Sequence, residues 1–478
     1  MLKVLRRGRR ASISPDATAL VTPTSSTLSA PSLFTFLLVG VCLGVAACRP
    51  IPEAPERWPV EHETRRVFAH YMVCCPTAGG DATVDDFARE IVAAQSRGID
   101  GFALNLGGWS REPHYKDKLA AIYAAAATLD SGFLLFPSAD FCCGLSDDDV
   151  IDLMESVYDH PNQFRFDGRP LLSSFSGGEN LGAIAARLAS AGRPVSLVPY
   201  VFPLPPVEHP RGRQIEDVAA RIPTADGFFF FAGPGTPAQH VETNARLAHQ
   251  WLGAGKVYMA GITPWYRGLG GNYRVYEGLG YEGTAAQWEN AIRLRIPWVQ
   301  IVTWNDWGEA SYIAPFGPPE STDLWSGHWG PTPSHEGWLD ASRHYIEWFK
   351  TGAPPVIRRD EIFYTYRTHS KHARGLVKPG GPDSDRPAGA SSLVDSIFVT
   401  AHLTAPARLV VSCGERSTAF ALAGGVHHVR APLDEGTPRF RLERDGEVVI
   451  DKTGEHAISS RDAWTNFNPF AGSASTDP

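Results

Sequence analysis

Short apolar runs alternate with amphipathic segments along the chain from about residue 66. Such runs predict buried parallel strands, and the segments between them predict helices. The strands are expected at Val67–Val73, Ile99–Leu106, Phe133–Ser138, Leu171–Phe175, Val195–Val201, Gly227–Ala232, Lys256–Ile262 and Trp298–Trp304. Eight strand and helix units over roughly 280 residues match a (β/α)8 TIM barrel, which usually has about 250. The predicted fold class is therefore α/β, with a doubly wound sheet as the alternative.

Two helices are expected to begin at capping boxes. Thr83 is followed three residues later by Asp86, and Ser146 is followed in the same way by Asp149. In this motif each side chain accepts a hydrogen bond from the other residue's backbone N–H, so the spacing marks the first turn of a helix.

The pattern changes after a helical segment at Trp338–Phe349, where the helical periodicity stops. A stretch rich in Gly, Pro, Asp and Ser, Pro379–Ser392, predicts a linker. Short alternating runs follow at Ile397–Leu403, Arg408–Cys413, Thr418–Leu422, Arg439–Glu443 and Val448–Ile450. Asp445-Gly446, between the last two runs, is a hairpin signal. Together these runs predict a small C-terminal antiparallel β-sandwich.

The expected organisation has six segments. They are a lipoprotein signal peptide at 1–48, a linker at 49–64, a catalytic barrel at 65–355, a connecting segment and linker at 356–392, the β-sandwich at 393–458 and a flexible tail at 459–478.

The N-terminal segment has the features of an export signal. Five Lys and Arg residues precede a Ser, Thr and Pro-rich spacer and an apolar run, Leu33–Ala47, that ends at Cys48. The run is shorter than the about 20 residues that a membrane-spanning helix needs. Val45-Ala46-Ala47-Cys48 resembles a bacterial lipobox, which predicts an exported lipoprotein, periplasmic or on the cell surface, anchored in the membrane through Cys48. An uncleaved anchor helix is the alternative.

Charge and composition narrow the possible partners. The chain has 44 Lys and Arg residues against 52 Asp and Glu, a formal net charge of −8. Nucleic-acid binding needs a basic surface, so no nucleic-acid partner is expected. No metal and no cofactor are predicted, and the protein is expected to be a monomer.

Two pairs of adjacent cysteines, Cys74-Cys75 and Cys142-Cys143, each follow an apolar run. The cysteines do not have the spacing of a zinc site. In an exported protein a disulfide between the two pairs is expected, and the sequence leaves open which sulfur atoms bond. Buried free thiols are the alternative.

The eighth predicted strand is followed by two carboxylates between indole rings, Trp304-Asn305-Asp306-Trp307-Gly308-Glu309. Barrel enzymes place their chemistry at the C-terminal ends of the strands. Glycosidic cleavage needs an acid to protonate the leaving oxygen and a base or nucleophile for the anomeric carbon, and a carboxyl pair supplies both. The alternative is structural, because Asp306-x-x-Glu309 is also the spacing of a capping box.

Polar and aromatic residues follow the other predicted strands as well. Those expected to bind substrate are His70, Tyr71, Asn105, Trp109, Glu179, Trp265, Tyr266, Trp304, Asn305, Trp307 and Tyr312. Asp140, after the third strand, is a third candidate catalytic carboxylate. Each residue alone has an alternative as a core or surface side chain, and it is their coincidence at strand ends that indicates a site.

These residues resemble glycoside hydrolase family 71, the α-1,3-glucanases or mutanases. The resemblance covers most of residues 66–455. It is most specific at Gln300–Glu309 followed by Ser311–Ile313, and it is weaker at Val67–Met72, Ile99–Asn105 and Thr365–His369. The resemblance implies a (β/α)8 barrel with a C-terminal β-sandwich that hydrolyses an α-1,3-linked glucan with inversion at the anomeric carbon and without a metal.

The resemblance also implies roles for the acids. Asp306 and Glu309 match the catalytic carboxylates, and Asp140 matches a third essential acid. By analogy with a related endo-mannosidase family that has two acids at this spacing, Glu309 is assigned as general acid and Asp306 as the base that activates water. A general acid beside an ionised partner must keep its proton, so the pKa of Glu309 is expected to be raised.

One departure from the family bears on the substrate. Family members usually read Glu-Ser-His-Tyr where this chain has Glu309-Ala310-Ser311-Tyr312, so a His that could contact sugar is missing. Two other functions stay open: an endo-acting α-mannan or other α-glycan hydrolase with the same acid pair, and a non-catalytic glycan-binding surface lipoprotein. Two acids between two tryptophans favour the enzyme over the binding protein.

Overall fold

The computed structural model describes residues 51–62, 64–175, 177, 179–203, 207–316, 332–374, 386–459 and 467–476. Cys48 and the signal-peptide segment 1–48 lie outside the described residues, so the structure does not bear on the lipid anchor. Among the residues it describes, no helix combines the length and the apolar character needed to cross a bilayer.

Parallel strands occupy all eight predicted positions. They are β1 Arg66–Met72, β2 Gly101–Leu106, β3 Leu134–Asp140, β5 Arg169–Phe175, β6 Ser196–Leu197, β7 Gly227–Phe230, β8 Val257–Ile262 and β9 Trp298–Ile301. Hydrogen bonds join β5, β3, β2, β1, β9, β8 and β7 in that order, β6 pairs with β5, and the short β4 (Arg165–Phe166) pairs antiparallel with β5. Because the last strand, β9, lies beside the first, β1, the sheet curls round.

The two free sides of this sheet, at β6 and β7, meet through backbone hydrogen bonds. Asp226 N donates to Leu197 O at 2.9 Å, and Phe229 N donates to Pro199 O at 3.0 Å. β6 is shorter than the predicted Val195–Val201, because Pro199 has no N–H to give to a ladder. The described fold is thus α/β, with a strongly curled parallel sheet.

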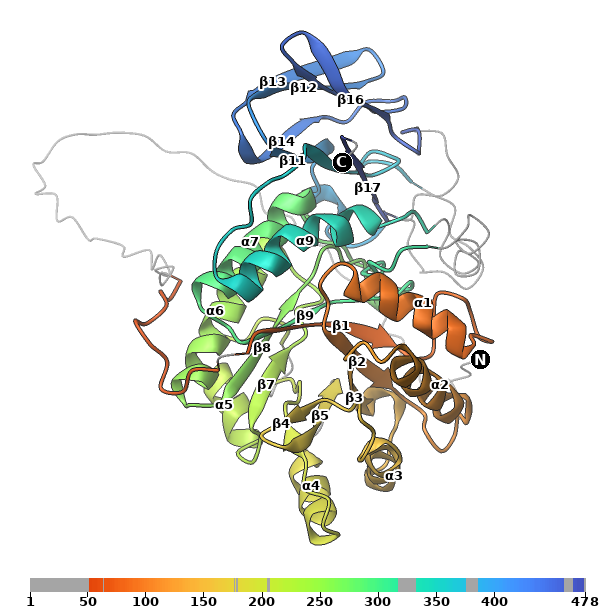
Figure 1. Ribbon diagram of the computed structural model, residues 1–478, viewed down its shortest axis with the longest axis vertical. Helices are drawn as coiled ribbons and strands as arrows, with labels where there is room; N and C mark the ends of the chain where they lie inside the picture. Colours follow the sequence, from red (N-terminus) through yellow and green to blue (C-terminus); the bar gives the residue numbers. More distant parts are fainter. Residues whose placement is uncertain are drawn as a thin grey trace, which may run out of the picture. The chain divides into compact units, whose positions relative to one another are not determined.

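The helices follow the strands along the chain. They are α1 Val84–Gln95, α2 His114–Leu129, α3 Asp147–Val157, α4 Leu181–Ser190, α5 Arg213–Arg221, α6 Pro237–Gly253, α7 Gly280–Arg293 and α9 Glu336–Thr351, with 3-10 turns η1 Phe141–Cys143, η2 Gly270–Asn272 and η3 Ala390–Ser392. Helices α1 and α2 pack against each other, and so do α6, α7 and α9 (Figure 1). Both predicted capping boxes are present, at the starts of α1 and α3.

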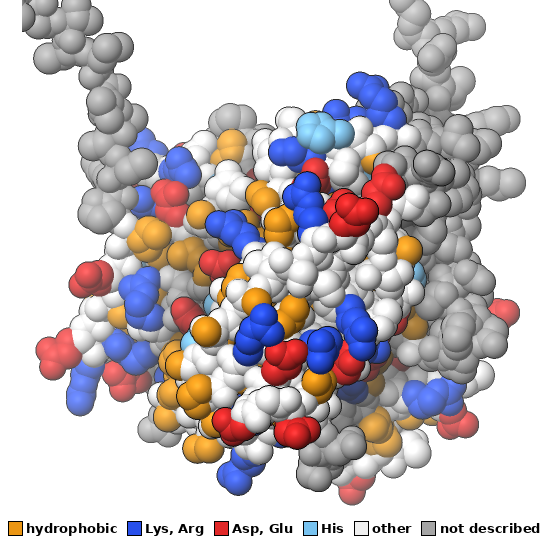
Figure 2. All heavy atoms as spheres, turned by 90° about the horizontal axis from the view of Figure 1, so that it is seen from above, with side chains coloured by type: hydrophobic (Ala, Val, Ile, Leu, Met, Phe, Trp, Pro, Cys, Tyr) orange, Lys and Arg blue, Asp and Glu red, His pale blue; other side chains and the backbone are white. Residues whose placement is uncertain are grey.

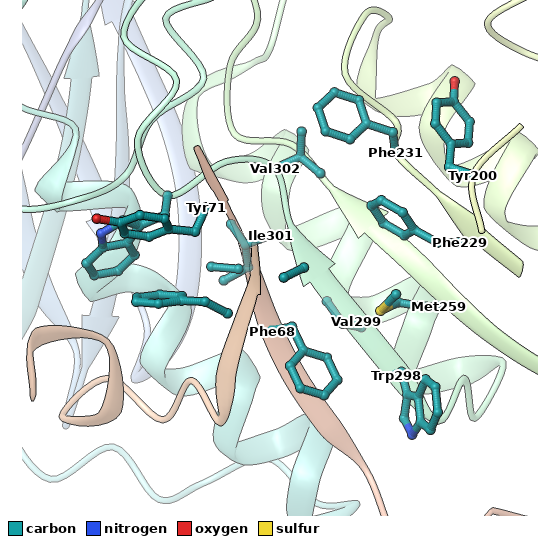
Figure 3. Packing of buried hydrophobic residues seen from close by; sticks show 14 of the residues in the cluster. Phe68, Tyr71, Tyr200, Phe229, Phe231, Met259, Trp298, Val299, Ile301 and Val302 are labelled. Atoms are coloured by element: carbon teal, nitrogen blue, oxygen red, sulfur yellow. The ribbon is translucent and has the colours of Figure 1, made fainter. Parts of the chain in front are cut away.

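Aromatic rings fill the space inside the curl. Phe68 of β1 contacts Phe136 of β3 and Trp298 of β9, with ring centroids 4.9 and 6.4 Å apart. His70, two residues further along β1, lies among Phe175, Phe229 and Phe231. Figure 3 shows Tyr71 on the other side of β1 from Phe68, so successive residues of this strand alternate between the interior and the helix side.

The C-terminal part of the chain forms two antiparallel sheets. Their strands are β10 Glu361–Tyr366, β11 Ser396–Leu403, β12 Ala407–Cys413, β13 Arg416–Leu422, β14 Gly425–Pro432, β15 Arg439–Arg444, β16 Glu447–Thr453 and β17 Phe470–Ser475. The orders are β14-β11-β10-β17 and β13-β12-β15-β16. Tyr364 of one sheet stacks on Phe440 of the other at 4.1 Å, within one hydrophobic cluster to which both sheets contribute. The face seen in Figure 2 has positive and negative side chains interspersed.

Five strands of this region lie where the alternation predicted them, and three were missed. β10 lies inside the predicted connecting segment 356–392, and β17 lies inside the predicted flexible tail 459–478, so both expectations are corrected. β17 pairs with β10 along its whole length, Glu361 opposite Ser475 and Tyr366 opposite Phe470. After Phe470 its residues are small, and α9 lies close to them: a Cβ on Gly337 would be 2.6 Å from the Gly472 nitrogen. Small residues leave no apolar alternation to detect.

Candidate active site

β9 ends at Ile301, and the chain then forms the loop that carries Asp306 and Glu309. Thr303 N donates to Ser311 O at 2.9 Å and Ile313 N donates to Thr303 O at 3.1 Å, which closes the base of the loop. The Val302–Thr303 peptide is cis. Both carboxylates therefore belong to one short loop at the C-terminal end of the parallel sheet.

Hydrogen bonds inside the loop link the two acids. Asp306 N donates to Thr303 Oγ1 at 2.9 Å, and Glu309 N donates to Asp306 Oδ1 at 2.8 Å. The second bond is the one a capping box would make, but residues 307–310 form a turn and no helix follows in the described residues up to 316. Asp306 thus holds the backbone of its partner acid, and both side chains stay partly exposed.

Asp140 lies at the end of β3, beside the end of β2. Asn105 Nδ2 donates to Asp140 Oδ2 at 3.3 Å, and Cys142 N donates to Asp140 Oδ1 at 3.0 Å. Burial raises the pKa of Asp140, and its negative charge adds to the raised pKa of Asp306. Asp140 is therefore held by Asn105 and lies close enough to Asp306 for its charge to act there.

Tyr266, at the end of β8, contacts Glu309 directly. Its hydroxyl donates to Glu309 Oε1 at 3.0 Å and accepts from Asn272 Nδ2 at 2.9 Å. Arg274 approaches the same hydroxyl, forms an ion pair with Glu208, and lies 5.8 Å from the centre of the Tyr276 ring. Two predicted binding residues thus bond to candidate catalytic acids, Tyr266 to Glu309 and Asn105 to Asp140.

Arg267 is a buried cation beneath the loop that the sequence analysis missed. Its Nη2 donates to Gly308 O at 2.7 Å, and its backbone N donates to Glu309 O at 2.8 Å. Only its place directly after Tyr266 could have pointed to it, whereas nothing local points to Arg274 or Glu208. The charge of Arg267 favours the ionised forms of Asp306 and Glu309.

The surroundings of the two acids differ. Burial, and then the charge of Asp306, raise the pKa of Glu309 to about 8, which is the direction predicted. Burial also raises the pKa of Asp306, but backbone N–H groups of Glu309 and Gly308 and the charge of Arg267 oppose that rise. Backbone donors stabilise a carboxylate rather than a carboxylic acid. The proton of the pair is therefore held on Glu309.

Tyr71 and Trp304 point away from the acids, which corrects their expected place among the substrate-binding residues. Both side chains are fully buried, and Figure 3 shows Tyr71 on the side of β1 away from Phe68. Tyr71 OH donates to Glu90 Oε1 at 3.1 Å and Trp304 Nε1 donates to Glu90 Oε2 at 2.7 Å. The sequence could not show this, because both sides of a parallel strand are apolar and the residue types do not reveal which side faces the interior.

Asn305, Trp307 and Tyr312 are also buried and bonded to protein groups rather than aimed at a ligand. Asn305 Nδ2 and Trp307 Nε1 both donate to Cys75 O, at 2.8 and 2.9 Å. Tyr312 OH donates to Pro333 O, and its ring stacks on His335 at 4.1 Å. These residues hold the loop in place, which corrects their predicted role in contacting sugar.

Three further predicted residues lie apart from the acids. Trp109 is buried and donates to Asp152 Oδ2 at 2.8 Å. Trp265 lines a small pocket together with residues of β10, and Glu179 forms an ion pair with Arg221.

His70 remains in the interior. Its Nδ1 lies 2.7 Å from Gln300 Nε2, and its buried Nε2 has no partner among the described residues. Burial lowers the pKa of His70 to about 3, so the ring is neutral.

The cysteines are arranged differently from the expectation. Cys74 and Cys75 form a disulfide with each other. Their two sulfur atoms are therefore already bonded and cannot pair with Cys142 or Cys143, which corrects the predicted bridge between the pairs. Burial and the charge of Asp140 raise the pKa of Cys143 to about 12, so its thiol stays protonated beside that carboxylate.

In the part of the chain that the structure describes, no group of three or more His, Cys, Asp or Glu residues is arranged to hold a metal ion. The acids themselves lie within reach of one another and of tyrosine, asparagine and arginine side chains. This arrangement can donate one proton and accept another, as hydrolysis of a glycosidic bond requires.

Comparisons with known proteins agree with this chemistry. The model of glycosyl hydrolase family 71 matches residues 63–478. A mutanase from Penicillium rubens is 30% identical over 422 residues, which cover 86% of this chain and 89% of the relative. A glucan endo-1,3-α-glucosidase from Schizosaccharomyces pombe is 29% identical, covering 85% of this chain and 94% of the relative.

Among solved structures, a GH99 endo-α-mannosidase from Bacteroides thetaiotaomicron aligns with 61% of this chain and 98% of its own length. The sequence identity is 16% and the TM-score is 0.44.

Proposed function

The chain belongs to glycosyl hydrolase family 71, and on that premise we propose that it hydrolyses α-1,3-glucosidic bonds of a polysaccharide. The observation that carries the proposal is the loop after β9, which holds Asp306 and Glu309 side by side, with Glu309 N donating to Asp306 Oδ1 and the pKa of Glu309 raised by burial and by Asp306. The relatives named as a mutanase and a glucan endo-1,3-α-glucosidase support the linkage.

Glu309 acts as the general acid in the proposed mechanism. Its raised pKa keeps the proton available near neutral pH, and Tyr266 OH fixes the Oε1 oxygen. Glu309 gives this proton to the leaving glycosidic oxygen as the bond to the anomeric carbon breaks. A proton positioned in this way contributes about 10² to 10⁴ in rate.

Asp306 acts as the base that takes a proton from the attacking water. Its carboxylate is favoured in the ionised form by two backbone N–H groups and by Arg267. Asp140, held by Asn105, lies close enough to influence Asp306 and is proposed to orient the water or a sugar hydroxyl. His70, with one ring nitrogen unpartnered among the described residues, is proposed to bind the sugar at the bottom of the site.

We propose that the reaction inverts the anomeric centre, because a base that delivers water directly leaves no glycosyl-enzyme intermediate. Proton NMR of the first product distinguishes the two outcomes. A β-anomer released from an α-glucan supports inversion, whereas an α-anomer would assign Asp306 as a nucleophile instead.

The missing family histidine bears little on the sugar in this proposal. Ser311, at that position, is buried, and its Oγ lies 3.1 Å from Thr303 Oγ1 at the base of the loop. The side chain therefore closes the loop and does not face the acids. We keep α-glucan as the substrate and use α-mannan as a comparison in the assay.

We also propose the complete architecture expected from the sequence. The curled sheet is taken as a closed (β/α)8 barrel, supported by the two backbone hydrogen bonds between the β6 and β7 regions, and the antiparallel sheets as a β-sandwich, supported by their shared core. Export and anchoring through Cys48 rest on the lipobox alone. Partition of the full chain into detergent, lost on Cys48→Ala, tests the anchor.

The decisive experiment measures sugar released from insoluble α-1,3-glucan by residues 49–478, with α-1,4-glucan, α-1,6-glucan and α-mannan alongside. Glu309→Gln tests the acid, and Glu347→Gln, at an exposed position of α9, is the matched control. Release from α-1,3-glucan alone, lost only in Glu309→Gln, supports the proposal. Release from α-mannan instead would show that α-mannan is the substrate. Release from none of the four polymers would contradict the proposed substrate.

A further inference from the structure

The turn after β1 is closed by the disulfide between Cys74 and Cys75. Cys75 N donates to Met72 O at 3.0 Å, so residues 72–75 form a tight turn. Lys118 Nζ, on α2, donates to Cys74 O at 2.9 Å. Both cysteines are partly exposed, so a small thiol can reach them.

This turn is hydrogen-bonded to the loop that carries the two acids, at the residues before and after Asp306. Met72 N donates to Asn305 Oδ1 at 2.7 Å, and Asn305 Nδ2 donates back to Met72 O at 3.0 Å and to Cys75 O at 2.8 Å. Trp307 Nε1 donates to the same Cys75 O at 2.9 Å. The residues immediately before and after Asp306 are therefore both bonded to the turn that the disulfide closes.

The loop has other anchors as well. Thr303 bonds with Ser311 at its base and accepts from Asp306 N, and Arg267 donates to Gly308 O and Glu309 O. The turn after β1 differs from them because it bonds the side chains on both sides of Asp306. Cys75 O accepts two of its four hydrogen bonds, so the position of this carbonyl contributes to how Asp306 is presented to the substrate.

We propose that the Cys74–Cys75 disulfide is a thiol-sensitive positioning element for Asp306, so that cleavage of the disulfide lowers the hydrolytic rate while the fold remains. The inference rests on the proposed function, since it assumes that Asp306 acts as the base. Adjacent cysteines joined by a disulfide close a small ring that includes their shared peptide. The ring contains the ψ torsion of Cys74 and the φ torsion of Cys75, and the Cys75 carbonyl lies just outside it. Opening the ring frees the φ torsion of Cys75, so the Cys75 carbonyl can move away from Asn305 and Trp307.

The chemical step is a thiol–disulfide exchange with a dithiol such as dithiothreitol. A thiolate of the dithiol attacks one sulfur, the Cys74–Cys75 bond breaks, and the leaving thiolate takes up a proton. The second thiol of the reagent then displaces the remaining cysteine, which is also protonated. The protein gains two electrons and two protons, and the reagent becomes its cyclic disulfide.

The test compares the full chain with Cys74→Ser/Cys75→Ser, before and after dithiothreitol. Alkylation and mass spectrometry of the Cys74–Cys75 peptide establish its redox state. We expect reduction of the wild type to lower kcat on α-1,3-glucan by about tenfold with KM nearly unchanged, since small displacements of a catalytic group have large rate effects. The acid limb of the pH profile, which reports Asp306, should move as well. The double variant should have the kcat of the reduced wild type, and dithiothreitol should not change it.

Cys413→Ser is the matched control, because Cys413 is a buried thiol of β12 in the C-terminal sheets. This variant should keep both its activity and the wild-type response to dithiothreitol. Oxidised dithiothreitol should restore the wild type. Full activity while the peptide is shown to be reduced, or an equal response in the double-serine variant, would overturn the proposal. Alkylation of Cys74 and Cys75 before any reductant is added would also overturn the proposal, because it would show that the disulfide is absent.

Amide hydrogen exchange separates this inference from the proposed function. The N–H groups of Asp306 and Glu309 are hydrogen-bonded inside the loop, so they should exchange faster after reduction even if no polymer is cleaved. Faster exchange without any hydrolysis would contradict the substrate but keep the positioning role. Hydrolysis with unchanged exchange and unchanged rate would contradict the positioning role alone.

Discussion

Burial acts on both Asp360, directly before β10, and Glu309, at the end of the parallel sheet, yet their pKa values are shifted in opposite directions. Burial would raise the pKa of Asp360, but hydrogen bonds from Arg444 and Thr404 lower it. Arg444 Nη1 and Nη2 donate to the two oxygens of Asp360 at 2.6 and 3.0 Å. Glu309 instead has burial and a second carboxylate acting together to raise its pKa.

The difference shows what a direct cation contact does to a buried acid. A guanidinium that bonds both oxygens keeps Asp360 ionised, so the residue ties the end of β15 to the start of β10. Near Glu309, Arg267 donates to a backbone carbonyl and Arg274 pairs with Glu208. The acid is left with a tyrosine donor, and it can carry a proton that it later releases.

The largest effect is expected for Glu309→Gln. Loss of the transferable proton should lower kcat by about 10³-fold, within the range for a general acid. The melting temperature at neutral pH should not fall, since Gln has nearly the shape of the protonated Glu309 and is likewise uncharged. The same change of carboxylate to amide at Asp360 should leave kcat unaltered. Steady-state kinetics on α-1,3-glucan measure kcat for both variants. A kcat of Glu309→Gln within tenfold of the wild type would contradict the role of Glu309 as general acid.

Asp360→Asn should give the largest loss of stability in this comparison. The substitution removes the charge-assisted hydrogen bonds that the buried Asp360 accepts from Arg444, while the partly exposed Arg444 keeps its bonds to Pro406 O and Ala405 O. The expected cost is about 2 kcal/mol. Because the pKa of Asp360 is lowered in the folded state, its contribution is present above the unfolded pKa and is lost as the pH falls through the folded value. Urea unfolding at pH 7 and pH 3 should show a difference from wild type that shrinks at the lower pH.

Glu90 extends the comparison to a buried acid with no catalytic role. Burial raises the pKa of Glu90 to about 6, against hydrogen bonds from Trp304, Thr77 and Tyr71. The folded state therefore keeps a proton that the unfolded state loses, so stability falls as the pH rises from about 4.5 to 6, by about 2 kcal/mol. The free energy of unfolding should fall with pH in this range for the wild type and not for Glu90→Gln. The same dependence on pH in both proteins would contradict the raised pKa of Glu90.

Tyr266→Phe should have the smallest effect. The hydroxyl favours the ionised form of Glu309, so its removal should raise the pKa of Glu309 further and move the basic limb of the pH profile upward. The loss of a fixed Oε1 should lower kcat by about tenfold, or about 1.4 kcal/mol. A pH profile of kcat/KM over the range 4 to 10 measures both changes, and a downward shift of the basic limb would contradict the contact.

Local patterns in the sequence predicted those parts of the fold that depend on residues close together along the chain. The eight parallel strands and both capping boxes lie where the sequence predicted them, because a strand buried on both faces is a continuous apolar run and a helix start has a fixed spacing of capping residues. The carboxylate motif after β9 was recognisable for a related reason, since a parallel strand presents its chemistry where it ends. The resemblance to a family then supplied what no periodicity contains, the bond to be cut.

Tertiary structure alone decided which side chains meet. Tyr71 and Trp304 have the composition of a sugar-binding site, but both sides of a parallel strand are buried, and only the position of Glu90 on α1 shows that they face outward. Arg267 and Arg274 reach the acids by folding, not by proximity to them in the sequence. β17 is a strand because β10 leaves an edge open to it, and α9 approaches it closely at Gly472. Contacts between distant segments determine these outcomes, and a one-dimensional pattern does not encode such contacts.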